Sequence, residues 1–153
     1  MDTDAIDLRA PRPEDRDVWG DLWTGYLDYY ETSLPQETYD TAFARLLSDD
    51  PATFSGRIAW RGTSALGLVH WVFHAHMWRP EGICYLQDLF TVPEARGQGV
   101  ARRLIEAVYA NADTHGIPRV YWLTQEFNYP GRMLYDRVGV RTPFIRYDRP
   151  AAG

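Results

Sequence analysis

The spacing of apolar positions changes between helical and strand-like several times along the chain. Apolar residues three and four apart predict an amphipathic helix over 14–30, with a stripe made of Val18, Trp19, Leu22, Trp23, Tyr26, Leu27 and Tyr30. The same spacing predicts helices at 36–47 and 99–115 and a shorter one at 130–138. Strand-like runs predict strands at 6–10, 55–60, 65–77, 83–91, 119–124 and 140–148.

These elements follow the order β-α-α-β-β-β-α-β-α-β, which predicts an α/β (α+β) three-layer fold with a mixed, mostly antiparallel sheet flanked by helices. Turn residues at 61–64 and 79–82 are expected to join the central strands. No repeat or linker interrupts the pattern, so the whole range 1–153 is expected to form one domain.

Composition narrows the function classes. Hydrophobic residues make up 45% of the chain and the formal net charge is −5, which disfavours nucleic acid as a partner and favours a cationic one. The sequence has no apolar run long enough to span a membrane and no apolar core in its first residues. Cys84 is the single cysteine, which excludes an internal disulfide and fits a reducing cytoplasm. We therefore expect a cytoplasmic protein.

The sequence RGQG at 96–99 lies between an apolar strand and the start of a helix. The leading N–H groups of a helix have no internal partner, and glycine lets a ligand approach them, so this turn favours a phosphate. Position 102 is Arg, which excludes the dinucleotide fingerprint, and no GK[ST] follows, which excludes a Walker loop. A purely structural turn is the remaining alternative.

Two motifs in the same order resemble the GCN5-related N-acetyltransferase (GNAT) superfamily. Arg96, Gly99 and Ala101 match its R-x-x-G-x-G/A signature, and LFTVPEARG resembles the approach to it. Downstream, Asn128 and Tyr135 lie in a stretch similar to the family's N-x-x-A-x-x-L-Y pattern. The resemblance covers essentially the whole chain, and the YLQDLF stretch is most similar to the histone and polyamine acetyltransferase branch.

The resemblance implies acetyl-CoA as cosubstrate, with its pyrophosphate on the backbone amides of the glycine turn and its pantetheine arm paired with the fourth strand. It implies that the fourth and fifth strands separate to expose unpaired backbone groups. The implied cofactor-binding residues are Leu89, Phe90, Thr91, Arg96, Gly97, Gln98, Gly99, Val100, Ala101 and Asn128. For Asn128, a helix cap is an equally open interpretation.

The resemblance also implies that Tyr135 protonates the departing CoA thiolate, a task suited to a neutral phenol. A buried tyrosine with a hydrogen-bonded hydroxyl is the alternative.

The residue that removes the amine proton is less evident. The family's glutamate position is Gln87, which can orient water but cannot accept a proton. If the turn at 79–82 closes a regular hairpin, His74 faces Gln87 and is a candidate base. A partly exposed strand histidine is the alternative. His70, His74 and His76 span too far for one zinc ion, so no metal is expected.

The acceptor is expected to be a small amine, a polyamine or a lysine-like side chain. Asp88 and Glu126 are the candidate acids for a cationic acceptor, although Asp88 points away from Gln87 unless a bulge intervenes. Tyr26 and Tyr29 are candidates for lining the pocket, with core packing as the alternative.

The sequence thus predicts an acetyl-CoA-dependent N-acetyltransferase that acts by direct attack. The missing glutamate at Gln87 leaves a non-catalytic acyl-CoA sensor open, and the aromatic helices leave an interaction module open. The edge at 143–148 could support a homodimer.

Overall fold

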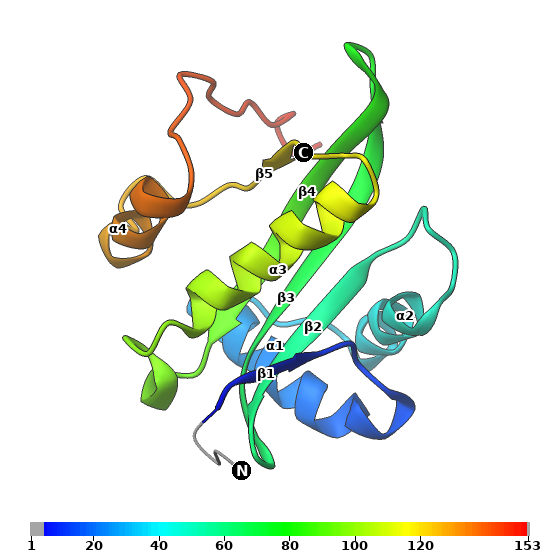
Figure 1. Ribbon diagram of the computed structural model, residues 1–153, viewed down its shortest axis with the longest axis vertical. Helices are drawn as coiled ribbons and strands as arrows, with labels where there is room; N and C mark the ends of the chain where they lie inside the picture. Colours follow the sequence, from blue (N-terminus) through cyan, green and yellow to red (C-terminus); the bar gives the residue numbers. More distant parts are fainter. Residues whose placement is uncertain (1–4, 153) are drawn as a thin grey trace. The chain divides into compact units, whose positions relative to one another are not determined.

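The computed structural model describes residues 5–152 and contains a five-stranded sheet in the order β1-β2-β3-β4-β5 (Figure 1). The first four strands, β1 (Asp7–Arg9), β2 (Ser55–Arg61), β3 (Ser64–His76) and β4 (Arg79–Thr91), pair antiparallel. The last strand, β5 (Val120–Tyr121), runs parallel to β4. The predicted mixed, mostly antiparallel sheet is therefore present.

The chain divides into two compact units, one that ends at Leu123 and one that starts at Thr124. The first unit holds the sheet with α1 (Arg16–Tyr29), α2 (Gln36–Leu47) and α3 (Val100–Thr114) and the short 3-10 turns Pro13–Asp15 and Pro93–Ala95. The second unit holds α4 (Tyr129–Val138). The expectation of one domain over 1–153 stays a prediction.

The two faces of the sheet carry different helices. Leu68 packs in a cluster with Trp19 of α1 and Phe43 of α2, whereas Trp71 donates a hydrogen bond to Asn111 of α3 at 3.2 Å. Because side chains alternate along a strand, α1 and α2 cover one face and α3 covers the other, where Figure 1 shows it crossing β3 and β4. Burial of these aromatic and aliphatic stripes holds the three layers together.

The β3–β4 hairpin turns at Met77 and Trp78, and residues 79–82 belong to β4. The turn expected at 79–82 is therefore wrong. Gly82, at φ +91°, instead lies at an irregularity where an added side chain would meet the His74 carbonyl. With this register His74 pairs with Ile83. The predicted opposition of His74 and Gln87 is wrong.

A second irregularity interrupts the same hairpin. His70 pairs with Asp88 and Trp71 pairs with Leu86, so Gln87 is the extra residue of a β-bulge. A bulge reverses the alternation of the residues that follow it. Asp88 thereby reaches the face of the sheet that His70 occupies.

The ladder between β4 and β5 is short. It joins Cys84 to Val120 and Tyr85 to Tyr121, and it goes no further toward Thr91. The fifth strand is thus shorter than the predicted range 119–124. Beyond Tyr85, the edge of β4 opposite β3 makes no ladder with β5, which is the separation that an added pantetheine arm requires.

The closing strand predicted at 140–148 is wrong. No strand forms there in the described part of the chain, and Val140, Phe144, Ile145 and Tyr147 are exposed. A strand depends on a partner ladder, and Pro143 offers no N–H to one. Among residues 5–152, no helix has the length and apolar character to cross a membrane.

Candidate active site

The turn before α3 presents unpaired backbone donors. Gly99 is the N-cap of α3 in the left-handed conformation (φ 83°), and no side chain caps the helix. The first bond is donated by the Arg103 amide to the Gly99 carbonyl at 3.1 Å, and no described residue accepts from the amides of Val100 and Ala101. These N–H groups lie at the positive end of a 15-residue helix.

Two side chains of the turn, those of Arg96 and Gln98, are bound to backbone carbonyl groups that precede the turn. The Arg96 Nε donates to the Thr91 carbonyl at 3.2 Å, and the Gln98 Nε2 donates to the Glu94 carbonyl at 3.1 Å. A Cβ added at Gly97 or Gly99 would meet nothing within 4 Å. Protein side chains thus leave both glycines accessible to a ligand, which fits a diphosphate group bound at the turn.

The end of β4 fits the arm of the same ligand. Leu89, Phe90 and Thr91 pair with β3 on one side, and the ladder with β5 has ended on the other. The Thr91 hydroxyl is buried and has no hydrogen-bond partner among the described residues. A buried hydroxyl without a partner is costly, so a polar ligand atom here would stabilise the site.

A buried polar network holds Asp88. His70 Nδ1 lies 2.8 Å from Asp88 Oδ2, and the Trp23 indole donates to the same oxygen at 3.3 Å. The Trp19 indole donates to His70 Nε2 at 2.9 Å. Because an indole N–H can only donate, Nε2 accepts and the proton of His70 lies on Nδ1, where it points to Asp88.

Tyr26 belongs to this network as well. Burial, followed by the charge of Asp88 and a hydrogen bond to it, raises the pKa of Tyr26 far above its usual value. The phenol therefore remains protonated and donates to the carboxylate. Asp88 thus accepts hydrogen bonds from three neutral donors, and no Arg side chain among the described residues forms an ion pair with it.

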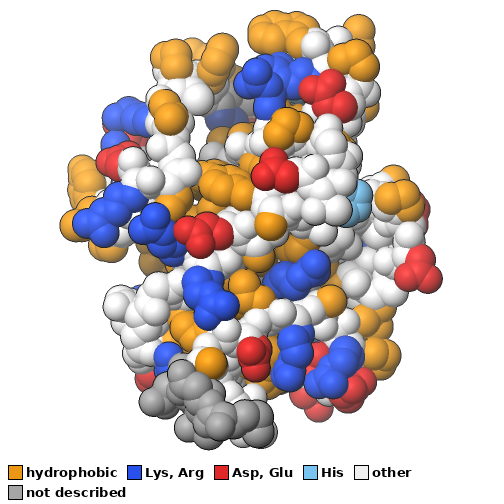
Figure 2. All heavy atoms as spheres, viewed as in Figure 1, with side chains coloured by type: hydrophobic (Ala, Val, Ile, Leu, Met, Phe, Trp, Pro, Cys, Tyr) orange, Lys and Arg blue, Asp and Glu red, His pale blue; other side chains and the backbone are white. Residues whose placement is uncertain are grey.

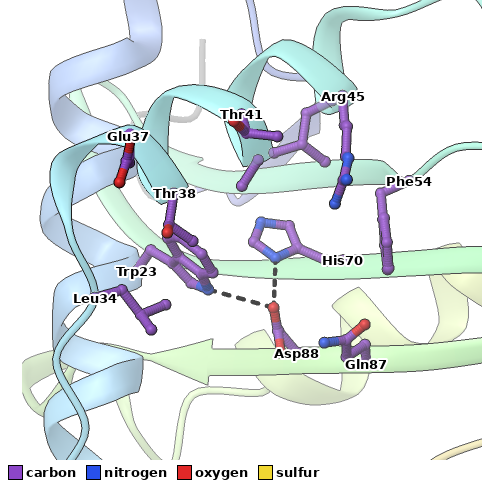
Figure 3. Close-up of a pocket in the computed structure, with 12 residues that line it drawn as sticks. Trp23, Leu34, Glu37, Thr38, Thr41, Arg45, Phe54, His70, Gln87 and Asp88 are labelled. Carbon is purple, nitrogen blue, oxygen red and sulfur yellow. Dashed lines mark hydrogen bonds and ion pairs between the residues drawn. The ribbon is translucent and has the colours of Figure 1, made fainter.

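A pocket of about 560 Å³ opens beside Asp88, with Trp23 of α1 on one side and α2 above. Figure 3 shows Glu37, Thr38 and Arg45 reaching down from α2 toward the floor of the pocket. That floor is formed by His70 of β3 and by Gln87 and Asp88 of β4. The bulge at Gln87 explains why two successive residues of β4 both reach it.

Several predicted site residues lie elsewhere in the first unit. His74 is exposed and contacts the Tyr121 hydroxyl at 2.8 Å and the Ala75 carbonyl at 2.9 Å. Tyr29 is half exposed and packs on Tyr30. Neither these residues nor Tyr26 line the pocket. Tyr26 supports it through Asp88.

The second unit carries the remaining candidates. The Asn128 side chain caps α4 by accepting from the Gly131 amide at 3.3 Å, and it donates to the Thr124 hydroxyl at 2.9 Å. The Glu126 carbonyl accepts from Arg132. Tyr135 lies in α4. The cap interpretation of Asn128 is confirmed, and the cofactor role of Asn128 stays a prediction.

Sequence reasoning missed the pocket wall on α2. Glu37, Thr38 and Arg45 resemble a solvated helix face in the sequence, and Glu37 and Arg45 are indeed exposed, so only the fold shows that this face lines a pocket with Asp88. The sequence shows His70 only as one of three histidines on the same strand, and its contacts with Trp19 and Asp88 depend on the fold. Among the described residues, no group of three His, Cys, Asp or Glu side chains could hold a metal ion.

The comparisons with known proteins agree with this geometry. The sequence model of the acetyltransferase (GNAT) family matches residues 19–140. The chain is 36% identical over 151 residues to the D-amino-acid N-acetyltransferase HPA3 of Saccharomyces cerevisiae, a match that covers 97% of this chain and 93% of that protein.

Solved structures share the fold at low sequence identity. The aminoglycoside acetyltransferase AAC(6')-Iy, in complex with a CoA bisubstrate analogue, has a TM-score of 0.81 at 18% identity and covers 97% of this chain and 99% of its own. The ribosomal-protein-alanine N-acetyltransferase of Brucella melitensis has a TM-score of 0.75 at 18% identity, covering 96% of this chain and 100% of its own. The family match and the yeast relative together show that this chain belongs to the GNAT family and is an N-acetyltransferase.

Proposed function

We propose that this enzyme transfers the acetyl group of acetyl-CoA directly to the primary amine of a small molecule. The observation that carries this proposal is that one strand, β4, joins both halves of the site. Gln87 and Asp88 form the pocket floor, and the strand continues through Thr91 into the glycine turn before α3. Thr91 follows Asp88 by three positions, about 10 Å of extended chain.

GNAT acetyltransferases use acetyl-CoA. In this chain the diphosphate would bind the amides of residues 97–101, beside Arg96, and the pantetheine arm would lie along residues 89–91. The open space beyond both glycines and the unpartnered Thr91 hydroxyl support this placement. Bound there, the cosubstrate supplies an activated acetyl group as a thioester.

The reaction also requires that the ammonium group of the acceptor loses a proton. An ammonium group must lose a proton before its nitrogen can form the new C–N bond, and the thioester C–S bond then breaks. Asp88 would hold the ammonium, and its proton would pass to water oriented by Gln87. His74 is an alternative base only if water connects it to the pocket, because it does not line the pocket itself.

The leaving thiolate needs a proton in return. The resemblance assigns that proton to the phenol of Tyr135, which lies in α4 three positions after Arg132. Among the other expected roles, Glu126 would contact the acceptor and Asn128 the cofactor.

Surface charge argues against nucleic acid as the partner. Figure 2 shows arginine and carboxylate side chains mixed over the face that α3 covers, where Arg102 and Glu106 form an ion pair at 3.0 Å. A nucleic-acid surface would instead be uniformly basic.

A panel of amines tests the proposal. The panel contains D- and L-amino acids, because the yeast relative is named for D-amino acids, together with diamines and an aminoglycoside. Purified enzyme is incubated with acetyl-CoA and each amine. Free thiol is then measured, and acetylated product is identified by mass spectrometry. We expect CoA and acetylated amine in equal amounts.

The composition of the chain keeps the background of this assay low. All 16 cationic side chains are arginine, so the enzyme has no lysine amine that could consume acetyl-CoA. Thiol release that exceeds background therefore reports on the added amine, apart from the chain's own N-terminus. Binding of CoA without thiol release for any amine of the panel would contradict the proposed transfer to a small-molecule amine.

A further inference from the structure

The pocket beside Asp88 carries an arginine that forms no ion pair with any carboxylate in the described part of the chain. Arg45 lies in the last turn of α2 and lines the pocket, and no ion pair among the described residues includes it. Figure 3 shows its guanidinium group hanging from α2 toward Phe54 and His70. Arg16, by contrast, is paired with Asp40 at 3.0 Å.

The negative charges of the pocket lie elsewhere on its wall. Glu37, in the first turn of α2, is separated from Arg45 by about 12 Å of helix, since each residue rises about 1.5 Å. Asp88 is on the floor and is held by Trp23, Tyr26 and His70. The pocket therefore offers an anion at its floor and a cation on α2, both facing the same cavity.

A ligand that matches this arrangement carries both charges close together. An α-amino acid does so, because its ammonium and carboxylate groups share one carbon atom. A diamine or polyamine would instead bring a second cation toward Arg45. The planar guanidinium group can bind a carboxylate through two parallel hydrogen bonds, which a lysine could not reproduce.

We propose that Arg45 binds the carboxylate of the acceptor, so that the enzyme selects zwitterionic amino acids whose amino group lies at Asp88 and Gln87. This inference rests on the proposed acetyl transfer. It identifies Arg45 as the specificity-determining residue, with Phe54 and Leu34 providing apolar wall for the amino acid side chain.

The test compares D- and L-phenylalanine with their carboxamides as acceptors for the wild type, Arg45→Ala and Arg45→Lys. We expect Arg45→Ala to lower kcat/KM about 30-fold for the acid that reacts, the size expected for a charged hydrogen-bonded pair. For the carboxamide we expect a change within about threefold, because it has no negative charge to lose. Since each substrate is compared between variants, the different basicity of the two amines cancels. Arg45→Lys should recover part of the lost activity.

Arg119→Ala is the matched control, because Arg119 precedes β5 and does not line the pocket. Arg119→Ala should leave kcat/KM unchanged for both the acid and the carboxamide. Urea unfolding checks that every variant is folded. Calorimetry in the presence of CoA adds a readout independent of turnover, in which the acid should bind the wild type but lose affinity for Arg45→Ala.

The outcomes separate the two proposals. An equal loss for acid and carboxamide, or no loss for the acid, would overturn the role of Arg45 while acetyl transfer stands. A wild type that acetylates the carboxamide but not the acid would do the same. A wild type that acetylates no amine at all would remove both proposals.

Discussion

At the scale of single residues, Gln87 has the largest effect on the site. As the extra residue of the bulge, it turns Asp88 onto the face of His70, where three neutral donors hold the carboxylate. Sequence alone could name Asp88 as an acid, but the side it faces depends on a register that local patterns do not determine. The same register removes His74 from the position predicted for it.

Cys84 gives a residue-scale prediction about pH. Burial raises the pKa of the Cys84 thiol to about 12 from a reference value of 9.0, so the folded protein keeps this thiol protonated when the unfolded chain has ionised it. We expect the native protein to react with iodoacetamide about 100-fold more slowly than the urea-unfolded chain near pH 9.

The sign of the effect follows from the raised pKa. The contribution of the thiol to the free energy of unfolding is fully present below the pKa of Cys84 in the unfolded chain. It declines as the pH rises toward the higher pKa of Cys84 in the folded protein. The alkylation rate of the native protein should therefore keep rising with pH above the point at which the alkylation rate of the unfolded chain has become constant. Equal native and unfolded rates would show that Cys84 is accessible and ionised.

Tyr135→Phe tests the proposed donor of the leaving-group proton. Loss of a positioned general acid should lower kcat by about tenfold or more, because the thiolate must then leave without a proton. The affinity for acetyl-CoA, measured by calorimetry, should change little. Tyr147→Phe is a suitable control, since Tyr147 is exposed in the C-terminal segment. Unchanged turnover in Tyr135→Phe would exclude Tyr135 as the acid.

At the scale of elements, the sequence predicted well those elements that depend on neighbouring residues only. The glycine turn and α3 follow from glycines, an apolar period and helix-end rules that involve neighbouring residues only. The hairpin tip was misplaced because Arg79–Gly82 has the composition of a turn yet continues the strand through a bulged glycine. The strand predicted at 140–148 failed because a ladder depends on a partner that the segment's own sequence does not specify.

Gly99→Ala tests the turn as a binding element. A non-glycine residue in the left-handed conformation costs about 1–2 kcal/mol, so urea unfolding should show a loss of that size. The added methyl group meets no protein atom within 4 Å. A loss of CoA affinity beyond the loss of stability must therefore come from the effect of the methyl group on the bound ligand. We expect CoA affinity to fall by about tenfold or more.

Gly116→Ala is the matched control at the other end of α3. Gly116 has φ +71° and the same open surroundings, so it should show a similar loss of stability with unchanged CoA affinity. If both variants weaken CoA binding equally, the turn before α3 is not the diphosphate site.

At the scale of the whole molecule, one sheet organises the first unit. The strand β4 carries the floor of the pocket beside Asp88, the edge freed from β5 and the approach to the glycine turn, while α1 and α2 close the pocket from one face. Family membership places this arrangement among acetyltransferases, and the charges on α2 line the pocket that we propose for the acceptor. The fold and the glycine turn could be predicted from the sequence, whereas the pocket beside Asp88 arises from contacts between elements distant in the chain.

Calorimetric titration of the wild-type chain with CoA and, separately, with pantetheine tests the central claim most directly, because the two ligands share the arm but only CoA carries the diphosphate and the adenosine 3'-phosphate attached to it. We predict one CoA per chain, bound about 100-fold more tightly than pantetheine, as expected when several helix-end amides bind a doubly charged group. Equal affinity for the two ligands, or no heat with CoA, would contradict the claim that the start of α3 binds the cosubstrate.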